Sequence, residues 1–165
     1  MKKRIIIGID PDVDMSGVAR VDSEGGKVWA DHLPFPLLID YLLTIKHIAK
    51  MQQADLLVYV EASWLISHNW HISQKDSKAL AGAKGKSIGA MQQVGKLILE
   101  MCSHHGITGI EQIPLKKIWK GRDGKITHEE ITQVTGWERK RSNQEERDAL
   151  LIAWNASGKP IKVRI

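Results

Sequence analysis

Acidic residues end two apolar segments of the sequence. Asp10 closes "RIIIGID", and Glu61 closes "ADLLVYVE". An unpaired carboxylate at the end of a buried strand costs free energy, or its pKa must change. A cation, either a basic side chain or a metal ion, is therefore expected beside these two carboxylates.

Two further acids, Glu145 and Asp148, lie in "EERDALLIAW". They are three residues apart, so they share one face of a helix, and that face continues into Ile152 and the core. If the strands ending at Asp10 and Glu61 are parallel neighbours, all these carboxylates meet at the sheet edge where α/β proteins bind ligands. Carboxylates gathered there repel one another unless a divalent cation neutralises them. Mg²⁺ prefers oxygen ligands, and two such ions about 4 Å apart would serve phosphodiester hydrolysis.

Each acid also has a structural explanation. Asp10 could begin a turn at the following proline. Glu61 could pair with a lysine, and Glu145 could stabilise the N-terminus of its helix through the helix dipole. Glu146 competes with Glu145 as a ligand, although the two differ in helical phase by about 100°. The metal interpretation rests on all the placements together.

The rest of the sequence predicts the elements that position these acids. Strands are expected over residues 4–10, 16–22, 26–32, 54–62 and 107–113, with "SEGG" as a hairpin turn. Helices are expected over 36–53 and 77–105. A third helix is expected to begin after Thr127, which forms a capping box with Glu130, and a fourth to run from Ser142 or Asn143 to a point before Gly158. This order predicts an α/β fold with a five-stranded mixed sheet, its first three strands antiparallel, flanked by helices. The 165 residues are expected to form a single domain, 1–165.

Composition narrows the class of protein. Lysine and arginine number 24 against 19 acids, which is compatible with a polyanionic partner. Cys102 is the single cysteine, so no disulfide can form within this sequence. Neither a signal peptide nor an apolar run of about 20 residues is found, so a soluble, cytoplasmic protein without membrane contact is expected.

Four segments together resemble RuvC-type Holliday junction resolvases (crossover junction endodeoxyribonucleases). They are "IIIGIDPDVDMSGVARVD", "VYVEASW", "KKIWKGRDGKITHEEI" and "EERDALLIAW", in the family's order and over essentially the whole chain. The resemblance implies an RNase H-like fold, a homodimer, and nicking of four-way DNA junctions that depends on Mg²⁺, with Mn²⁺ as a substitute. It implies paired symmetric nicks that leave 5′-phosphates, in DNA recombination and repair.

By position, the family's catalytic, metal-binding carboxylates fall on Asp10, Glu61, Glu145 and Asp148. Glu145 stands where members have Asp or His, so the sequence departs from the family pattern there. Asp12 stands where the family has glycine, and Asp14 follows nearby. We favour solvated turn residues for both, the alternative being an altered metal site.

The resemblance also implies residues that contact DNA. Trp64 stands where the family carries an aromatic on a loop that enters the junction, where stacking on a base would contribute ~1–3 kcal/mol. The alternative is that Trp64 packs over the strand end; Trp70 is a weaker candidate for the same role. Basic residues of two segments are expected to contact phosphates: Lys84, Lys86, Lys116, Lys117, Lys120, Arg122 and Lys125. A basic face that only contacts solvent would look the same in sequence.

Other functions stay open at this point. One is an RNase H-like nuclease that acts on other branched DNA or on RNA–DNA hybrids. Another is a junction-binding protein without catalytic activity. Symmetric cleavage would need two active sites, and the glycine-bearing helix over 77–105 is the expected dimer interface. The sequence identifies no helicase partner.

Overall fold

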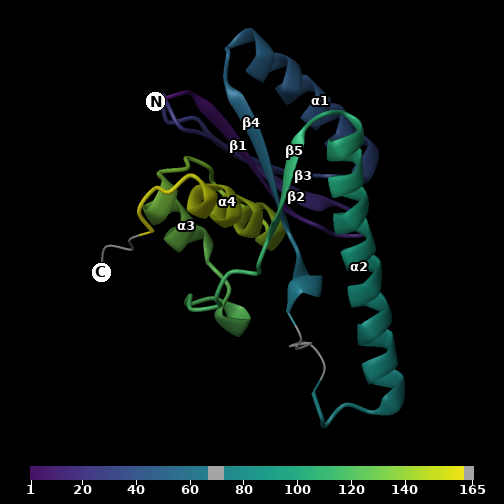
Figure 1. Cartoon of the computed structure of the whole chain (residues 1–165). Helices are drawn as coiled ribbons and strands as arrows, with labels where there is room; N and C mark the ends of the chain where they lie inside the picture. Colours follow the sequence, from purple (N-terminus) through teal and green to yellow (C-terminus); the bar gives the residue numbers. More distant parts are fainter. Residues whose placement is uncertain (67–72, 162–165) are drawn as a thin grey trace.

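A five-stranded sheet organises the computed structural model, which describes residues 1–66 and 73–161 (Figure 1). The strands are β1 (Arg4–Asp10), β2 (Ser16–Asp22), β3 (Val28–Leu33), β4 (Asp55–Glu61) and β5 (Thr108–Gln112). Their order is β3-β2-β1-β4-β5. The first three strands are antiparallel, whereas β4 runs parallel to β1 and β5 parallel to β4. The predicted fold class, an α/β fold with a five-stranded mixed sheet flanked by helices, is confirmed.

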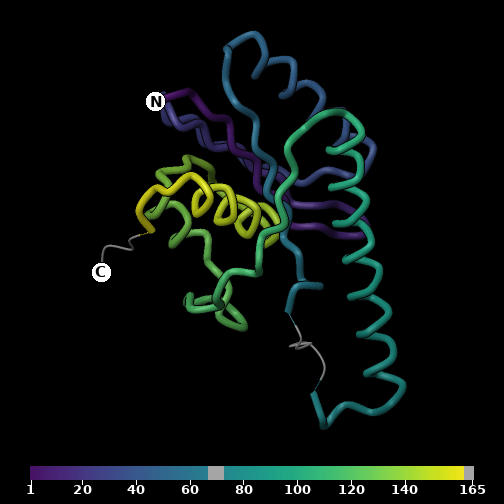
Figure 2. Tube along the Cα trace, in the orientation of Figure 1, coloured from purple at the N-terminus to yellow at the C-terminus, as the bar shows by residue number. Residues whose placement is uncertain are grey.

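Helices cover both faces of the sheet, as Figures 1 and 2 show. On one face lie α1 (Phe35–Met51) and α2 (Lys78–His104), and on the other α3 (His128–Thr135) and α4 (Gln144–Ala156). Short 3-10 turns, η1 (Ser63–Leu65) and η2 (Arg122–Gly124), follow β4 and β5. No helix in the described part of the chain is long and apolar enough to span a bilayer.

The strand β1 shows how the sequence divides between the two faces. Ile5, Ile7 and Ile9 are buried with α1 and α2, whereas Ile6 belongs to the core under α3 and α4. Because successive side chains of a strand point to opposite faces, Asp10 shares the face of Ile6. The carboxylate at the end of β1 therefore points toward the α4 layer.

Local signals fix most helix and strand boundaries. The capping box of Thr127 and Glu130 opens α3, as predicted, and a second one, Asn143 with Glu146, opens α4. The strand predicted from residue 26 begins at Val28 instead. Gly25 and Gly26 have φ of 77° and 61°, so both belong to the hairpin turn.

Candidate active site

Strands β1 and β4 bring Asp10 and Glu61 together. In their parallel register Ile9 lies opposite Val60, so the two acids are the next residues on neighbouring strands. Tyr59, two residues before Glu61, packs into the core under α3 and α4, so Glu61 points to the same layer as Asp10. Both carboxylates thus stand at one sheet edge on the α4 face.

The helix α4 brings the other two acids to this edge. It lies so close to the sheet that a Cβ built on Gly8 would come within 2.3 Å of the Ala149 carbonyl oxygen. As a result Glu145 and Asp148 line the same pocket as Asp10 and Glu61. The structure therefore places all the predicted metal-binding acids around one cavity.

Burial and mutual repulsion raise the pKa values of these acids. The pKa of Asp10 lies well above its ordinary value, first because of burial and then because of the charges of Glu61 and Asp148. Burial and the Asp148 charge likewise raise the pKa of Glu61, while Lys117 and Lys125 act in the opposite direction. Burial raises the pKa of Asp148 as well, despite a hydrogen bond from Gln144 and the charge of Lys125. The nearby lysines therefore do not fully offset the effects of burial and mutual repulsion on these carboxylates.

The pocket acids differ from other acids of the chain in their hydrogen bonds. In the described ranges, no hydrogen-bond donor contacts the carboxylates of Asp10, Glu61 or Glu145. By contrast, Asp22 accepts two bonds from Arg20, at 2.7 and 2.9 Å, although both side chains are buried. Acids that only stabilise a fold are satisfied by donors in this way. In the described structure no buried side-chain oxygen or nitrogen lacks a partner, so the oxygens of the pocket acids without a donor are open to the pocket.

Asp12 and Asp14 form a turn beside the pocket. The Asp12 Oδ1 accepts a hydrogen bond from the Asp14 backbone N–H at 2.9 Å, which is the favoured turn arrangement. Asp14 is exposed, whereas Asp12 also lines the pocket. The turn therefore explains the Asp12 carboxylate in part, whereas Asp14 contributes only its backbone N–H and its side chain is exposed.

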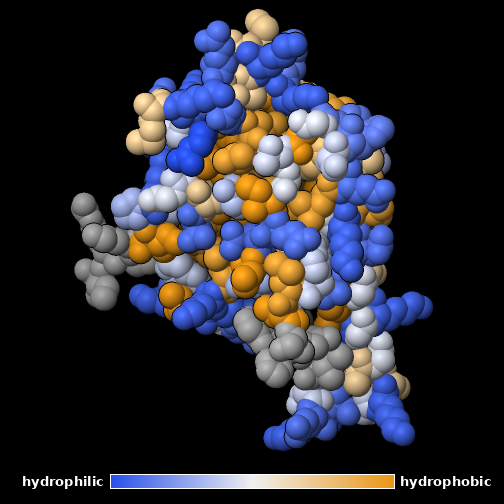
Figure 3. All heavy atoms as spheres, viewed as in Figure 1, coloured by the Kyte–Doolittle hydropathy of each residue, from blue (hydrophilic) through white to orange (hydrophobic). Residues whose placement is uncertain are grey.

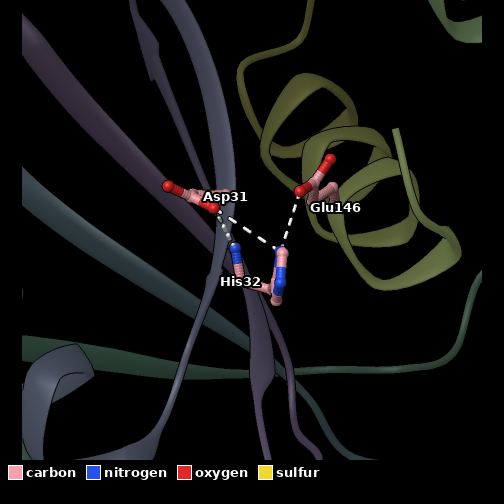
Figure 4. A group of neighbouring side chains, drawn as sticks. All are labelled: Asp31, His32 and Glu146. Carbon is pink, nitrogen blue, oxygen red and sulfur yellow. Dashed lines mark hydrogen bonds and ion pairs between the residues drawn. The ribbon is translucent and has the colours of Figure 1, made fainter. Parts of the chain in front are cut away.

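Glu146, the competitor of Glu145, points elsewhere (Figure 4). Its carboxylate is buried, with Oε1 2.8 Å from Nδ1 of His32 and Oε2 3.5 Å from Nη1 of Arg139. It also closes the α4 capping box with Asn143. Asp31, His32 and Glu146 are the one trio of potential metal ligands within 4.8 Å of one another among the described residues. Because Glu146 is already partnered by His32, Arg139 and the capping box, we assign this trio a structural role.

The pocket acids suit a divalent metal in their chemistry. Their ligand atoms are carboxylate oxygens, which hard cations such as Mg²⁺ prefer. Within the described residues, no three of them come as close as the trio of Figure 4. The residues that could hold metal are Asp10, Glu61, Glu145 and Asp148.

The predicted basic residues separate into two groups. Lys116, Lys117 and Lys125 line the pocket, and Lys125 Nζ lies 4.0 Å from Asp148 Oδ2. Lys120 and Arg122 are exposed on the same loop. Lys84 and Lys86 instead lie in the N-terminal half of α2 and do not line the pocket; Lys84 pairs with Asp76 at 2.8 Å.

Trp64 packs within the chain. A Cβ built on Gly95 of α2 would meet the Trp64 Cζ3 at 2.9 Å, and Lys96 Nζ lies 5.5 Å from the centroid of the ring. The structure thus shows the packing alternative, and a contact of Trp64 with DNA stays a prediction. Trp70 lies outside the described residues.

One residue of the site, Gln144, escaped the sequence interpretation. Its side-chain amide donates to Asp148 Oδ1 at 2.7 Å and to the Ile126 carbonyl at 3.3 Å. Gln144 therefore fixes the orientation of a pocket carboxylate. The signal was present in the sequence, because Gln and Asp four residues apart on a helix form such bonds.

Comparisons with known proteins find likeness only among solved structures. No protein-family model matches the sequence, and no curated protein matches it. The chain is similar to T. thermophilus RuvC in complex with Holliday junction substrate, with 14% identity, a TM-score of 0.47, and coverage of 94% of this chain and 96% of that one. It is also similar to the large terminase nuclease from the thermophilic phage G20c, with 14% identity, a TM-score of 0.31, and coverage of 93% and 82%. Likeness at this level transfers no function, which must be argued from the site itself.

Proposed function

We propose that this chain is a metal-dependent nuclease that hydrolyses phosphodiester bonds in branched DNA, with the four-way (Holliday) junction as its main substrate. The supporting observation is the pocket in which Asp10, Glu61 and Asp148 have raised pKa values. Both Asp10 and Glu61 line this pocket, and neither carboxylate accepts a hydrogen bond in the described structure, in contrast to the buried Asp22, which pairs with Arg20. Acids gathered in this way are suited to hold cations that act on a phosphate.

Asp10, Glu61, Glu145 and Asp148 would hold two Mg²⁺ ions per subunit, with Mn²⁺ as a substitute. When bound, the ions supply charge neutralisation, activation of the attacking water and stabilisation of the leaving 3′-oxygen, so that the product carries a 5′-phosphate. Gln144 keeps Asp148 oriented toward the pocket through its 2.7 Å hydrogen bond. This positioning reduces the reorganisation that substrate binding requires.

Lysines of the loop after β5 complete the site. Lys125, 4.0 Å from Asp148, would stabilise the negative charge that develops on the phosphate in the transition state. Lys117 lies close enough to Glu61 to lower the pKa of Glu61, and it would stabilise the same charge together with Lys125. Lys116, Lys120 and Arg122 would contact neighbouring phosphates, which positions the backbone without reading sequence.

Paired symmetric nicks in a junction, as in recombination and repair, would need two copies of the site. A homodimer with two-fold symmetry supplies them. A Cβ built on Gly82 or on Gly89 of α2 would meet no atom of the described residues within 4 Å. This surface of the helix has room for a closely approaching partner, so the N-terminal half of α2 is the proposed dimer interface.

The test uses an end-labelled immobile four-way junction with Mg²⁺, and a linear duplex as the substrate control. Wild type should give paired symmetric nicks in the junction only. Asp10→Asn and Asp148→Asn should bind the junction without nicking it. Glu146→Gln, an acid outside the pocket, should retain the nicks.

Other outcomes would replace this proposal. Junction binding without nicks, in Mg²⁺ or Mn²⁺, would indicate an inactive junction-binding protein. Preferred cleavage of a fork or of an RNA–DNA hybrid would keep the nuclease and change its substrate. Nicks that persist in both Asp variants would remove the pocket from the mechanism.

A further inference from the structure

Exposed apolar side chains lie on the loops that leave the sheet edge of the acid pocket. Val13 and Met15 follow β1, and their exposed fractions are 55% and 42%. Leu65 follows β4 and is 46% exposed. Ile113 and Ile118 follow β5 and are 58% and 75% exposed. A single exposed aliphatic residue on a surface is ordinary. These residues instead share the loops that leave one edge of the sheet, the edge that carries the carboxylates. Figure 3 shows hydrophobic atoms at the surface beside hydrophilic ones where the chain leaves β5.

Ile118 is the most exposed residue of this group, and its loop has a defined conformation. The Trp119 N–H donates to the Gly124 carbonyl at 2.9 Å, and the Gly121 N–H donates to the Lys125 carbonyl at 2.9 Å. The Lys120 N–H donates to the buried Glu130 carboxylate of α3 at 3.1 Å. These bonds fix the loop beside Ile118. Its exposure is therefore a property of the fold.

The residues around Ile118 indicate what it contacts. Its neighbours Lys117 and Trp119 both line the acid pocket, so Ile118 stands at the rim of the site. Trp119 also packs into the core under α3 and α4, which leaves Ile118 as the outward apolar side chain between lysines. A ligand for this rim must offer negative charge to the lysines and an apolar face to the isoleucine.

An unstacked nucleobase next to its own phosphate offers both. In continuous duplex DNA the base faces are covered by stacking, so an apolar side chain reaches them only if a base step unstacks, which costs about a few kcal/mol. At a branch point the strands exchange between arms, so the base pairs there unstack at lower cost, and a wedge such as isoleucine inserts more easily. We propose that Ile118 is a wedge that packs against an unstacked base at the rim of the pocket, and that it makes the site selective for branched over linear DNA. This inference rests on the proposed nuclease function.

The experiment follows base unstacking directly. A four-way junction carries 2-aminopurine at the branch point, and binding is measured with Ca²⁺ in place of Mg²⁺. The variants are Ile118→Ser, the conservative Ile118→Met, and Leu37→Ser, an aliphatic residue of α1 with 53% exposure on the opposite face of the sheet. Nicking with Mg²⁺ is measured in parallel, with Asp10→Asn as the inactive reference.

Wild type should increase the 2-aminopurine fluorescence. Ile118→Ser should lose most of this increase and bind the junction roughly tenfold more weakly, with duplex binding unchanged. Ile118→Met and Leu37→Ser should behave like wild type. Thermal melting should be unaffected in all the Ile118 and Leu37 variants, because the changed side chains are exposed.

If Ile118→Ser showed the same fluorescence increase and the same substrate preference as wild type, the wedge would be overturned. The nuclease proposal would still stand in that case, provided that Asp10→Asn abolished nicking. A change from dimer to monomer in Ile118→Ser, without loss of the fluorescence increase, would instead assign this rim to a second copy of the chain. If wild type neither binds nor nicks any DNA, both proposals fail.

Discussion

Gly17 of β2 lies directly against the backbone of Glu145 in α4. A Cβ built on Gly17 would come within 2.0 Å of the Glu145 carbonyl oxygen, far inside van der Waals contact. Gly8 of β1 has the same relationship to Ala149, one turn further along the helix. These two glycines let α4 approach the sheet closely enough for its acids to reach the pocket that Asp10 lines. The site therefore depends on residues that have no side chain.

Gly17→Ala should separate α4 from the sheet and displace Glu145. The overpacking is expected to cost about 1–3 kcal/mol of unfolding free energy and to abolish junction nicking. Thermal melting and the nicking assay measure the two effects. The control, for melting of the folded chain only, is Gly82→Ala in α2, where a Cβ would meet no described atom within 4 Å. Its nicking is not compared, because Gly82 lies in the proposed dimer interface. There the gain in helix propensity should leave stability equal or raise it by about 1 kcal/mol. A Gly17→Ala protein that melts and nicks like wild type would contradict the close approach of α4.

Asp10→Asn should stabilise the protein when no divalent cation is present. The substitution removes a buried charge that Glu61 and Asp148 repel. The melting temperature should therefore rise, by roughly 2–4 °C for each kcal/mol of unfolding free energy gained. Mg²⁺ should then raise the melting temperature of wild type only. The control is Asp22→Asn, which should destabilise because Asp22 pairs with the buried Arg20. A destabilised Asp10→Asn protein would mean that this carboxylate serves the fold.

The stability of wild type without divalent cations should depend on pH in a direction set by Asp10 and Glu61. Their pKa values are raised in the folded state, so the folded protein holds protons that the unfolded chain has already released. Their contribution is therefore most favourable below the ordinary carboxylate pKa of about 4, and it is lost as pH rises through the raised values. Mg²⁺ competes with these protons, so the increase in melting temperature that it causes should grow with pH.

Melting curves between about pH 5 and pH 8, with and without Mg²⁺, test this dependence. Glu130 and Asp76 have lowered pKa values, so their stabilising effect is lost as the pH falls, the opposite direction. The difference between wild type and Asp10→Asn isolates the pocket from these groups. A Mg²⁺ effect of equal size at every pH would show that the raised carboxylates are not the metal ligands.

The sequence predicted the elements of this fold well because their signals are local. The run Ile5–Ile9 and the Thr127 capping box need no knowledge of distant residues. Helical spacing favoured Glu145 over Glu146 but left the choice open, since it depends on how α4 is rotated on the sheet. That rotation is fixed by the contact of Gly17 with Glu145 and by the hydrogen bond of Glu146 to His32. The packing of Trp64 against α2 likewise depends on a residue thirty-one positions later, Gly95.

Glu145 and Glu146 should therefore give opposite results on substitution. Glu145→Gln should leave unfolding free energy unchanged or slightly higher, because no hydrogen bond of the described structure ends on its carboxylate. It should reduce the Mg²⁺-induced rise in melting temperature and lower nicking about 100-fold, the cost of losing one charged group that acts in the transition state.

Glu146→Gln should instead lose about 1 kcal/mol of unfolding free energy, because two interactions weaken with a neutral amide. Its carboxylate closes the α4 capping box and lies 2.8 Å from Nδ1 of His32. The Mg²⁺ effect and the nicking should persist, since Glu146 faces away from the pocket. Melting curves with and without Mg²⁺ on both variants decide the assignment. Loss of the Mg²⁺ effect in Glu146→Gln but not in Glu145→Gln would move the ligand to Glu146 and the metal toward Asp31 and His32.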